Sequence, residues 1–351
     1  MQEQKRHPTI EDVARTAGVS RAAVSKVLRN AYGVSPAMKE RVDAAIEHLH
    51  YRPRVAARAM RGSSFTLGIE IPDFGNHFFT RLLGGATRAL VGTPYQLIIA
   101  PAEGGSQEGY RAIEALADRQ VDGIVAISPL VSPEWLERLA ERTPLVMLGR
   151  HDRSTGYDTV VGDDAAGARL VLDHLLGLGH RRIAHLTRSE DVTVPSSGTP
   201  HSIRLAVYLE RMRAAGHENQ VRVVRTGEGE EAAEAAAAEL LRSEPTPTAI
   251  FAAHDELAIG ALRAVDEAGL DVSVAGYDDI RIAAQPGISL TTVDQSGEEM
   301  GERAVRLLLD RIAGRTEPVH EVFAPTLVPR RSTRAPAESV TAGSPAAAAA
   351  G

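Results

Sequence analysis

Closely spaced helix signals fill the first part of the chain. Residues 10–17 place apolar side chains at positions i, i+3, i+4 and i+7, which form one face of a helix. Thr9, followed three residues later by Asp12, predicts a capping box at the start of this helix, and Gly18 predicts its end. Ser20 predicts the start of a second helix directly after the turn. Helix, short glycine-containing turn and helix is the pattern of a helix-turn-helix unit.

A third helix follows, because Ser35 supplies a capping hydroxyl and Pro36 suits the first helical position. The second helix then exposes a polar and basic face. This face carries Arg21, Ala22, Ser25, Lys26 and Arg29. Such a helix fits the DNA major groove with its N-terminal residues at base edges. The alternative is a small helical bundle with a solvated charged face.

Residues 53–61 favour the DNA interpretation. The segment is short and alanine-rich, with Arg54, Arg58 and Arg61 and one large apolar residue, Met60. A helix this short is marginal in water, so we expect it to fold only against a partner. Paired with its copy in a dimer, it would push Met60 into the minor groove and unstack a base step. The alternative is a plain linker, but a linker needs no arginines.

Charge is divided unevenly along the chain. Residues 1–62 contain 12 Lys and Arg against 6 Asp and Glu, whereas the whole chain contains 39 against 46. A basic head on an acidic body predicts a polyanionic partner at one end only. The chain has no cysteine, signal peptide or apolar run long enough to cross a membrane. We therefore expect a cytoplasmic, nucleoid-associated protein, and we expect no cofactor and no metal.

From residue 66 onward, short apolar runs alternate with helical stretches. The apolar runs predict strands buried on both faces, at residues 66–71, 95–100, 123–127, 144–148, 182–186, 221–225, 249–253, 272–277 and 321–327. The helical stretches cover residues 78–90, 107–119, 133–140, 165–178, 203–215, 230–241, 256–269 and 298–312. Alternation of this kind predicts parallel sheets in two α/β subdomains, with a ligand in the cleft beyond the carboxyl ends of the strands.

Residues 9–28, TIEDVARTAGVSRAAVSKVL, resemble the headpiece of the lac/purine repressor (LacI–GalR) family almost residue for residue. The resemblance extends to about residue 330 through motifs such as IPDFGNHFF (71–79), VVGDDAAG (160–167) and VAGYDD (274–279). It implies an all-α helix-turn-helix headpiece joined to an α/β, two-subdomain, periplasmic-binding-protein-like effector domain with parallel sheets. It also implies that residues from about 296 to 324 return to the first subdomain.

The expected domains are a headpiece with hinge helix at 1–62, an effector-binding and dimerisation domain at 63–330, and a disordered Pro/Ala-rich tail at 331–351. The resemblance makes Arg21 and Ala22 the main base readers and gives Met60 the place of a leucine wedge. The expected DNA-binding residues are Thr9, Ser20, Arg21, Ala22, Ser25, Lys26, Arg29, Ser35, Tyr51, Arg54, Arg58, Met60 and Arg61. Double-stranded DNA with a palindromic operator is the expected partner of the homodimer.

Polar residues at strand ends form the expected effector site. The set is Asp73, Asn76, Phe78, Phe79, Arg150, Asp163, Arg204, His254, Asp255, Asp278 and Gln295. Carboxylates accept hydroxyl protons and arginine offers a fork of donors, so the set suits a sugar or sugar derivative. Taken singly, each residue is as well explained as a helix cap or a salt bridge. With only Trp135 as tryptophan, no stacking platform for a sugar ring is evident in the second subdomain.

Two other chemistries have weaker support. Residues 227–232, GEGEEA, mimic a dinucleotide fingerprint, but four glutamates around that helix start would repel a pyrophosphate. The chain has no G-x-S-x-G or H-E-x-x-H motif, so no enzymatic activity is expected. We therefore expect a sequence-specific transcriptional regulator, most simply a repressor of carbohydrate-related genes released by its effector. The alternatives are a corepressor-dependent regulator and, in another class, a solute-binding protein or sugar-handling enzyme.

Overall fold

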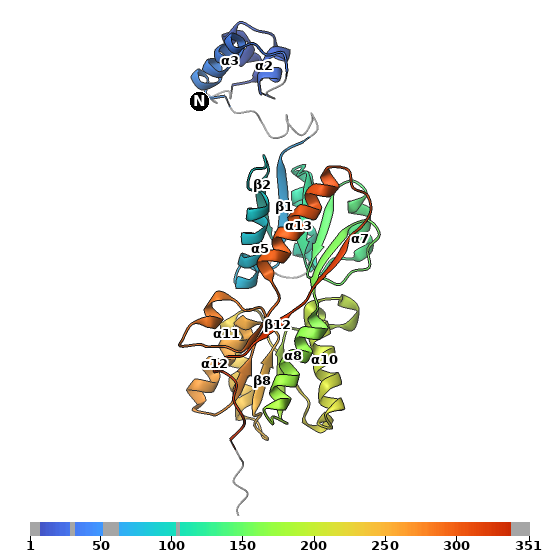
Figure 1. Ribbon diagram of the computed structural model, residues 1–351, viewed down its shortest axis with the longest axis vertical. Coiled ribbons are helices and arrows are strands. Elements are labelled where there is room, and N and C mark those ends of the chain that lie inside the picture. Colours follow the sequence, from blue (N-terminus) through green and yellow to red (C-terminus); the bar gives the residue numbers. More distant parts are fainter. Residues whose placement is uncertain (1–7, 29–31, 52–62, 103–105, 338–351) are drawn as a thin grey trace, which may run out of the picture. The chain divides into compact units, whose positions relative to one another are not determined.

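The structure is a computed structural model that describes residues 8–28, 32–51, 63–102 and 106–337 (Figure 1). It divides into two compact units, Met1–Ser64 and Phe65–Gly351. The division falls two residues after the expected boundary at residue 62. Within the described residues, no helix is both long and apolar enough to cross a membrane.

The head contains three helices, α1 (Ile10–Ala17), α2 (Arg21–Leu28) and α3 (Pro36–His48). The predicted capping box is present, since the Thr9 backbone N donates to the Asp12 carboxylate over 2.9 Å and the Asp12 backbone N donates to the Thr9 hydroxyl. Gly18 ends α1 with φ of 63°, a left-handed conformation that favours glycine.

The other two helix starts are also confirmed. Ser20 accepts a hydrogen bond from the Ala23 backbone N at 3.2 Å, and Ser35 caps α3 ahead of Pro36. The three helices meet around the fully buried side chains of Val13, Val24 and Val42. Packing of this small core fixes the angle between α1 and α2, and thereby presents the opposite face of α2 to solvent.

The second unit begins with a six-stranded sheet in the order β11-β5-β4-β3-β1-β2, in which all pairs are parallel. Its strands are β1 (Thr66–Ile71), β2 (Gln96–Pro101), β3 (Gly123–Ile127), β4 (Leu145–Leu148), β5 (Asp158–Gly162) and β11 (His320–Phe323). Its helices are α5 (His77–Ala89), α6 (Ser106–Asp118), α7 (Pro133–Ala140) and α13 (Gly297–Ile312). This is the first subdomain.

The second subdomain has a parallel sheet in the order β7-β6-β8-β9. Its strands are β6 (Ile183–Thr187), β7 (Arg222–Arg225), β8 (Ala249–Ala252) and β9 (Ser273–Ala275), and β10 (Thr292–Asp294) pairs antiparallel with β12 (Thr326–Val328) beside them. Its helices are α8 (Asp164–Gly177), α9 (Glu190–Thr193), α10 (Pro200–Ala214), α11 (Glu230–Arg242) and α12 (Asp255–Ala268), with short 3-10 turns at Pro195–Ser197, Glu218–Gln220 and Arg281–Ala284.

The chain passes between the subdomains three times, after β5, after β10 and after β11 (Figure 1). The expected return of residues 296–324 to the first subdomain is confirmed, because α13 packs on α5 and β11 pairs with β5. The single strand predicted over residues 321–327 is wrong. It is two strands, one in each subdomain, because the third crossing falls between Phe323 and Thr326.

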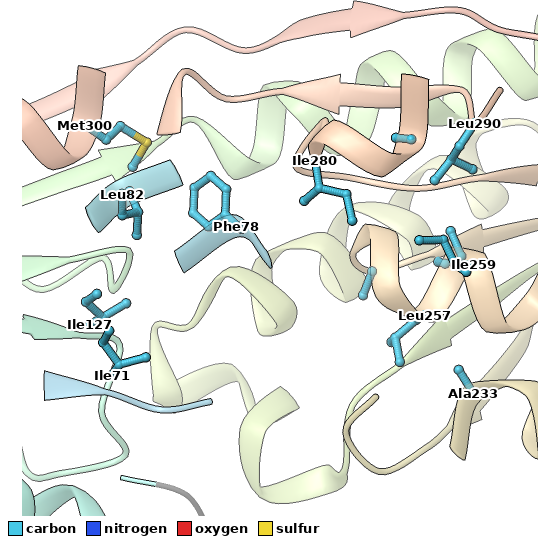
Figure 2. Close-up of a cluster of buried hydrophobic side chains, with 14 of the residues drawn as sticks. Ile71, Phe78, Leu82, Ile127, Ala233, Leu257, Ile259, Ile280, Leu290 and Met300 are labelled. Carbon is cyan, nitrogen blue, oxygen red and sulfur yellow. The ribbon is translucent and has the colours of Figure 1, made fainter. Parts of the chain in front are cut away.

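Glycines allow α5 and α13 to approach closely. A Cβ atom on Gly85 would lie 1.8 Å from the backbone oxygen of Glu298, and one on Gly301 would lie 2.0 Å from that of Leu82. One buried apolar cluster includes both sides of this contact and continues into the second subdomain. Figure 2 shows Met300, Leu82 and Phe78 on one side and residues of the second subdomain, including Leu257 and Ile280, on the other.

The expected boundary at residue 331 between the effector domain and a disordered tail lies too early in the chain. Ser332 accepts a hydrogen bond from the Val274 backbone N at 2.8 Å and donates its own backbone N–H to Ser289 at 3.0 Å. The Arg334 carbonyl accepts from Ser273 and interacts with His180. These contacts cover the outer edge of β9, and so residues as far as 334 belong to the second subdomain.

Candidate functional site

The solvent-facing side of α2 is basic. Arg21, Ala22 and Lys26 are exposed, and Ser25 is partly buried. Arg21 makes only a loose ion pair with Glu11, at 3.7 Å between two exposed side chains. Such a pair contributes little to stability, so the guanidinium remains available to another partner.

The remaining predicted DNA-binding residues fall into two groups. Thr9, Ser20 and Ser35 are helix caps, as described above, and Tyr51 is buried in the head core with 9% of its surface exposed. All four therefore have a structural role in the head. The others lie outside the described residues, and they are Arg29, Arg54, Arg58, Met60 and Arg61.

A cavity of about 490 Å³ lies between the two subdomains of the second unit. Its walls come from the carboxyl ends of β1, β3 and β4 on one side and from β6, β8 and the start of α10 on the other. Eight of the predicted effector-site residues line it: Asp73, Asn76, Phe78, Phe79, Arg204, His254, Asp278 and Gln295. The size of this cavity, and its mostly apolar lining with a few converging polar groups, are typical of small-molecule sites.

Arg204 is held in the cavity wall by several partners. Its Nε and Nη2 donate to the same Asp164 oxygen at 2.9 and 2.7 Å, and Nη1 donates to the Ala253 carbonyl. The guanidinium also lies 3.6 Å from the centre of the Tyr277 ring. Burial acts to lower the pKa of Arg204, but the charges of Asp164 and its neighbours outweigh burial and hold the pKa above its usual range. Arg204 is therefore a fixed cation that is positioned before any ligand arrives.

Asp278 lies beside Arg204, with 3.9 Å between its Oδ1 and Nη2 of the arginine. Gln295 donates its side-chain N–H to the same carboxyl oxygen. Burial raises the pKa of Asp278 well above its usual range, while Arg204 opposes the rise. The backbone φ of 115° at Asp278 is rare for a residue with a side chain. Strain of this kind is typical of functional sites, where surrounding packing holds a side chain in place.

Two histidines form a contact pair in the cavity wall. The rings of His201 and His254 meet edge to face, 5.4 Å apart between centroids. Burial lowers the pKa of both well below its usual range, and Arg188 and Arg204 add to the effect, so both imidazoles are neutral. The sequence pointed to His254 but not to His201, which follows Pro200 in the first turn of α10.

Arg188 is a second arginine in the cavity and was not predicted. It follows β6, forms an ion pair with Glu228 and lies near Asp73 and Asp191. Burial lowers its pKa to about 10, although the two aspartates oppose the shift. Its position directly after a buried strand is the same signal that identified the other site residues, and it could have been applied here.

Three predicted effector-site residues do not line this cavity. Asp163 caps α8, accepting from the Ala166 backbone N at 2.9 Å, and its neighbour Asp164 faces the cavity instead. Asp255 is fully buried and binds Thr292 and the Ile280 backbone N. Arg150 is buried against Asp152 and the carbonyls of residues 129 and 131. All three have structural partners that explain their chemistry without a ligand.

The described residues contain no cluster of three His, Asp or Glu side chains that could hold a metal ion. Carboxyls at Asp73, Asp164 and Asp278 offer acceptors to a ligand and guanidiniums at Arg188 and Arg204 offer donors, and all of these groups except Asp73 belong to the second subdomain.

Comparison with known proteins agrees with this architecture. A model of bacterial regulatory proteins of the lacI family matches residues 9–54, and one of the periplasmic binding protein-like domain matches residues 172–333. The ribose operon repressor of Escherichia coli strain K12 is 33% identical over 313 residues, which cover 87% of this chain and 93% of that protein.

Two solved structures match over nearly the whole chain. The complex of the transcriptional regulator CelR with cellobiose is 32% identical, with a TM-score of 0.67, covering 93% of this chain and 100% of the other. The lac repressor dimer bound to operator and the anti-inducer ONPF is 26% identical, with a TM-score of 0.77, covering 94% and 100%. The chain therefore belongs to the lacI family of bacterial regulatory proteins, and is a DNA-binding transcriptional regulator with a small-molecule-binding domain rather than an enzyme.

Proposed function

We propose that this regulator is a homodimeric repressor of carbohydrate-related genes, released from a palindromic operator by a sugar-like molecule bound in the interdomain cavity. The observation that carries the proposal is the Arg204–Asp164–Asp278 cluster inside that cavity. Two carboxyls accept hydroxyl protons while a fixed guanidinium donates, and this combination suits a polyhydroxylated molecule. The relatives named for ribose and bound to cellobiose support the same ligand class.

On the DNA side, the proposal gives α2 the reading role. Arg21, Ala22 and Ser25 at its N-terminal end would contact base edges, while Lys26 contacts phosphate. Met60 and its neighbouring arginines are proposed to act in the central minor groove, as the sequence predicts. The site of action is the cytoplasm, on the nucleoid.

Ligand control requires that the two states of the protein differ in their contacts. Closing the cavity moves one subdomain against the other, and a coupling of ~1–3 kcal/mol between ligand and operator is enough for regulation. Since coupling is reciprocal, operator DNA should weaken ligand binding by the same factor if the ligand releases the repressor.

The test is capture of sheared genomic DNA by the purified full-length protein, followed by sequencing of the bound fragments. A shared palindrome near promoters of sugar-utilisation genes is the expected result, with release on adding the sugar that those genes process. Capture only in the presence of a small molecule would identify the corepressor-dependent alternative. Absence of any enriched sequence, with or without cell extract, would contradict DNA reading by the head.

A further inference from the structure

The interior of strand β1 contains a carboxyl group, Glu70, that is completely buried. Its neighbours in the strand, Ile69 and Ile71, are also buried, and β1 pairs with strands on both sides. The Ile127 backbone N donates to Glu70 Oε2 at 2.8 Å. The other oxygen, Oε1, has no hydrogen-bond partner, and Glu70 lines the interdomain cavity. A half-satisfied carboxyl in a sheet interior is costly, and so it demands an explanation.

Burial raises the pKa of Glu70 to about 8, although the Ile127 N–H and the charge of Arg150 oppose the rise. At neutral pH the carboxyl is therefore mostly uncharged. An uncharged carboxyl has one O–H donor and remaining acceptor capacity, so it can act both as a donor and as an acceptor.

The wall from the second subdomain carries matching groups. His254 has 2% of its surface exposed, and neither of its ring nitrogens has a partner. The Nδ1 atom of His201 is likewise buried without a partner. A neutral imidazole also offers one donor and one acceptor. Uncharged, unpartnered groups of the same hydrogen-bonding type thus line one cavity from both subdomains.

We propose that Glu70 is a ligand-contacting, specificity-determining residue whose free carboxyl oxygen hydrogen-bonds an uncharged hydroxyl group of the bound sugar. The proposal rests on the sugar ligand of the proposed function and narrows it to uncharged sugars. A hydroxyl is at once donor and acceptor, as are the three groups that lack partners.

The lining disfavours the alternatives to a hydroxyl. Both arginines are already paired, Arg188 with Glu228 and Arg204 with Asp164, so a phosphate or carboxylate on the ligand would find no free cation among the lining residues that the structure describes. An ammonium only donates hydrogen bonds, so it could not accept from the donors of Glu70 and the imidazoles. The ionisable groups facing the cavity with Glu70 are Asp73, Asp164, Arg188, Asp191, His201, Arg204, Glu228, His254 and Asp278. The charge of Arg150, which follows β4, acts to lower the pKa of Glu70.

The experiment is titration calorimetry of the full-length protein with D-ribose, D-glucose and cellobiose, and with glucosamine, glucuronate and glucose 6-phosphate as charged counterparts. At least one uncharged sugar should bind, and the three charged glucose derivatives should each bind at least about tenfold more weakly than that sugar. Glu70→Leu should lower the affinity for the uncharged sugar by about tenfold, since one hydrogen bond is lost and the sugar hydroxyl is left without its partner. Glu70→Gln keeps the Ile127 bond and an outward N–H donor, so its affinity should stay within about threefold of wild type.

A monodeoxy series of the bound sugar then tests the direct contact. In the wild-type protein, removal of one particular hydroxyl should weaken sugar binding. The same removal should not weaken binding to the Glu70→Leu variant, because that hydroxyl and the Glu70 carboxyl form a single interaction. Equal losses at every position in both proteins would overturn the contact.

The pH profile covers the case in which Glu70→Leu does not fold, as judged by melting and operator binding. Wild-type affinity should fall above about pH 8, where Glu70 ionises, and the Glu70→Gln profile should stay flat relative to it. Parallel profiles would overturn the inference. If the wild-type protein binds a sugar tightly and neither variant changes the affinity, the role of Glu70 alone is overturned. If the protein binds its operator but responds to none of the uncharged sugars, both the proposed sugar class and the inference are overturned.

Discussion

Two arginines, Arg21 in the head and Arg204 in the effector unit, show how differently the two functional surfaces are built. Arg21 is exposed, and its ion pair with Glu11 spans 3.7 Å. Arg204 is 3% exposed and is held by Asp164, the Ala253 carbonyl and the Tyr277 ring. The first residue is free to meet a partner at little cost to the fold, and the second is part of the fold before it meets a ligand. Substitutions at the two sites should therefore fail in different ways.

Arg204→Ala should produce the largest effect. Removing the guanidinium leaves the buried Asp164 beside Asp278 with the His151 ring, 2.8 Å from its Oδ2, in place of a fixed cation. Breaking a buried pair from one side costs about 3–5 kcal/mol of unfolding free energy. Urea denaturation followed by fluorescence or circular dichroism checks this value, and calorimetry checks the expected loss of sugar binding. Arg204→Lys keeps the charge but loses the forked bonds, so it should fall between wild type and alanine. An alanine variant as stable as wild type would show that Arg204 is no more structural than Arg21.

Glu70 sharpens the contrast through pH. Its folded pKa of about 8 lies above the ordinary value of 4.5, so the folded state binds the proton more tightly. The stability from the protonated carboxyl is complete below pH 4.5 and is lost as pH rises to about 8. The unfolding free energy of wild type should therefore fall relative to Glu70→Gln across this window, by up to about 1.4 kcal/mol per pH unit. Melting both proteins at half-unit pH steps measures the difference, and a constant difference would contradict burial of the acid.

Arg21→Ala should separate binding from stability in the opposite sense. We expect a change in unfolding free energy below about 0.5 kcal/mol, since the residue is exposed. Affinity for the operator should fall by about tenfold to a hundredfold per head, which corresponds to about 1–3 kcal/mol for a base contact. Gel shift or fluorescence anisotropy against the captured palindrome measures it. Arg15→Ala is the matched control, because Arg15 is also exposed, at 76% against 66% for Arg21, but belongs to α1 and not to the proposed reading helix. Its loss should leave specificity unchanged.

Thr9→Ala should produce the smallest effect and should be confined to the head. The Thr9 hydroxyl accepts the Asp12 backbone N–H, and loss of such a cap costs about 1 kcal/mol. Hydrogen exchange of peptides covering residues 9–28 in the full-length protein should accelerate, while peptides from β3 and β4 should not change. Equal acceleration in both units would mean that they unfold together.

Most elements could be predicted because their signals are local. The strand Gly123–Ile127 and the helix Pro133–Ala140 were predicted to the residue, since an apolar run and a Ser-Pro start mark their ends. The strand Asp158–Gly162 was missed because it begins with a carboxylate. The structure pairs Asp158 with Arg315 at 2.6 Å, a partner more than 150 positions away that the sequence alone does not reveal.

The same limit applies to the cavity. Residues directly after strands, such as Asp73 and Asp278, were found because strand ends can be located by pattern. Glu70 lies within a strand, and its one visible signal was a charged letter in the run TLGIEI. Asp163 was predicted as the carboxylate of a family motif, but its neighbour Asp164 is the residue that contacts Arg204. Only the turn of α8 decides which of the two caps the helix and which one faces Arg204.

The three crossings between the subdomains have a mechanical consequence. They run next to one another, since Gly162 of β5 pairs with Phe323 of β11 and Asp294 of β10 pairs with Thr326 of β12. Three adjacent straps resist sliding and twisting of one subdomain on the other, and leave bending across the straps as the soft motion. Asp164 and Gln295 lie on or next to these straps and also line the cavity. A ligand bound there acts close to the axis of bending. A displacement of a fraction of an ångström at its hydrogen bonds therefore becomes a much larger displacement at the far end of each subdomain.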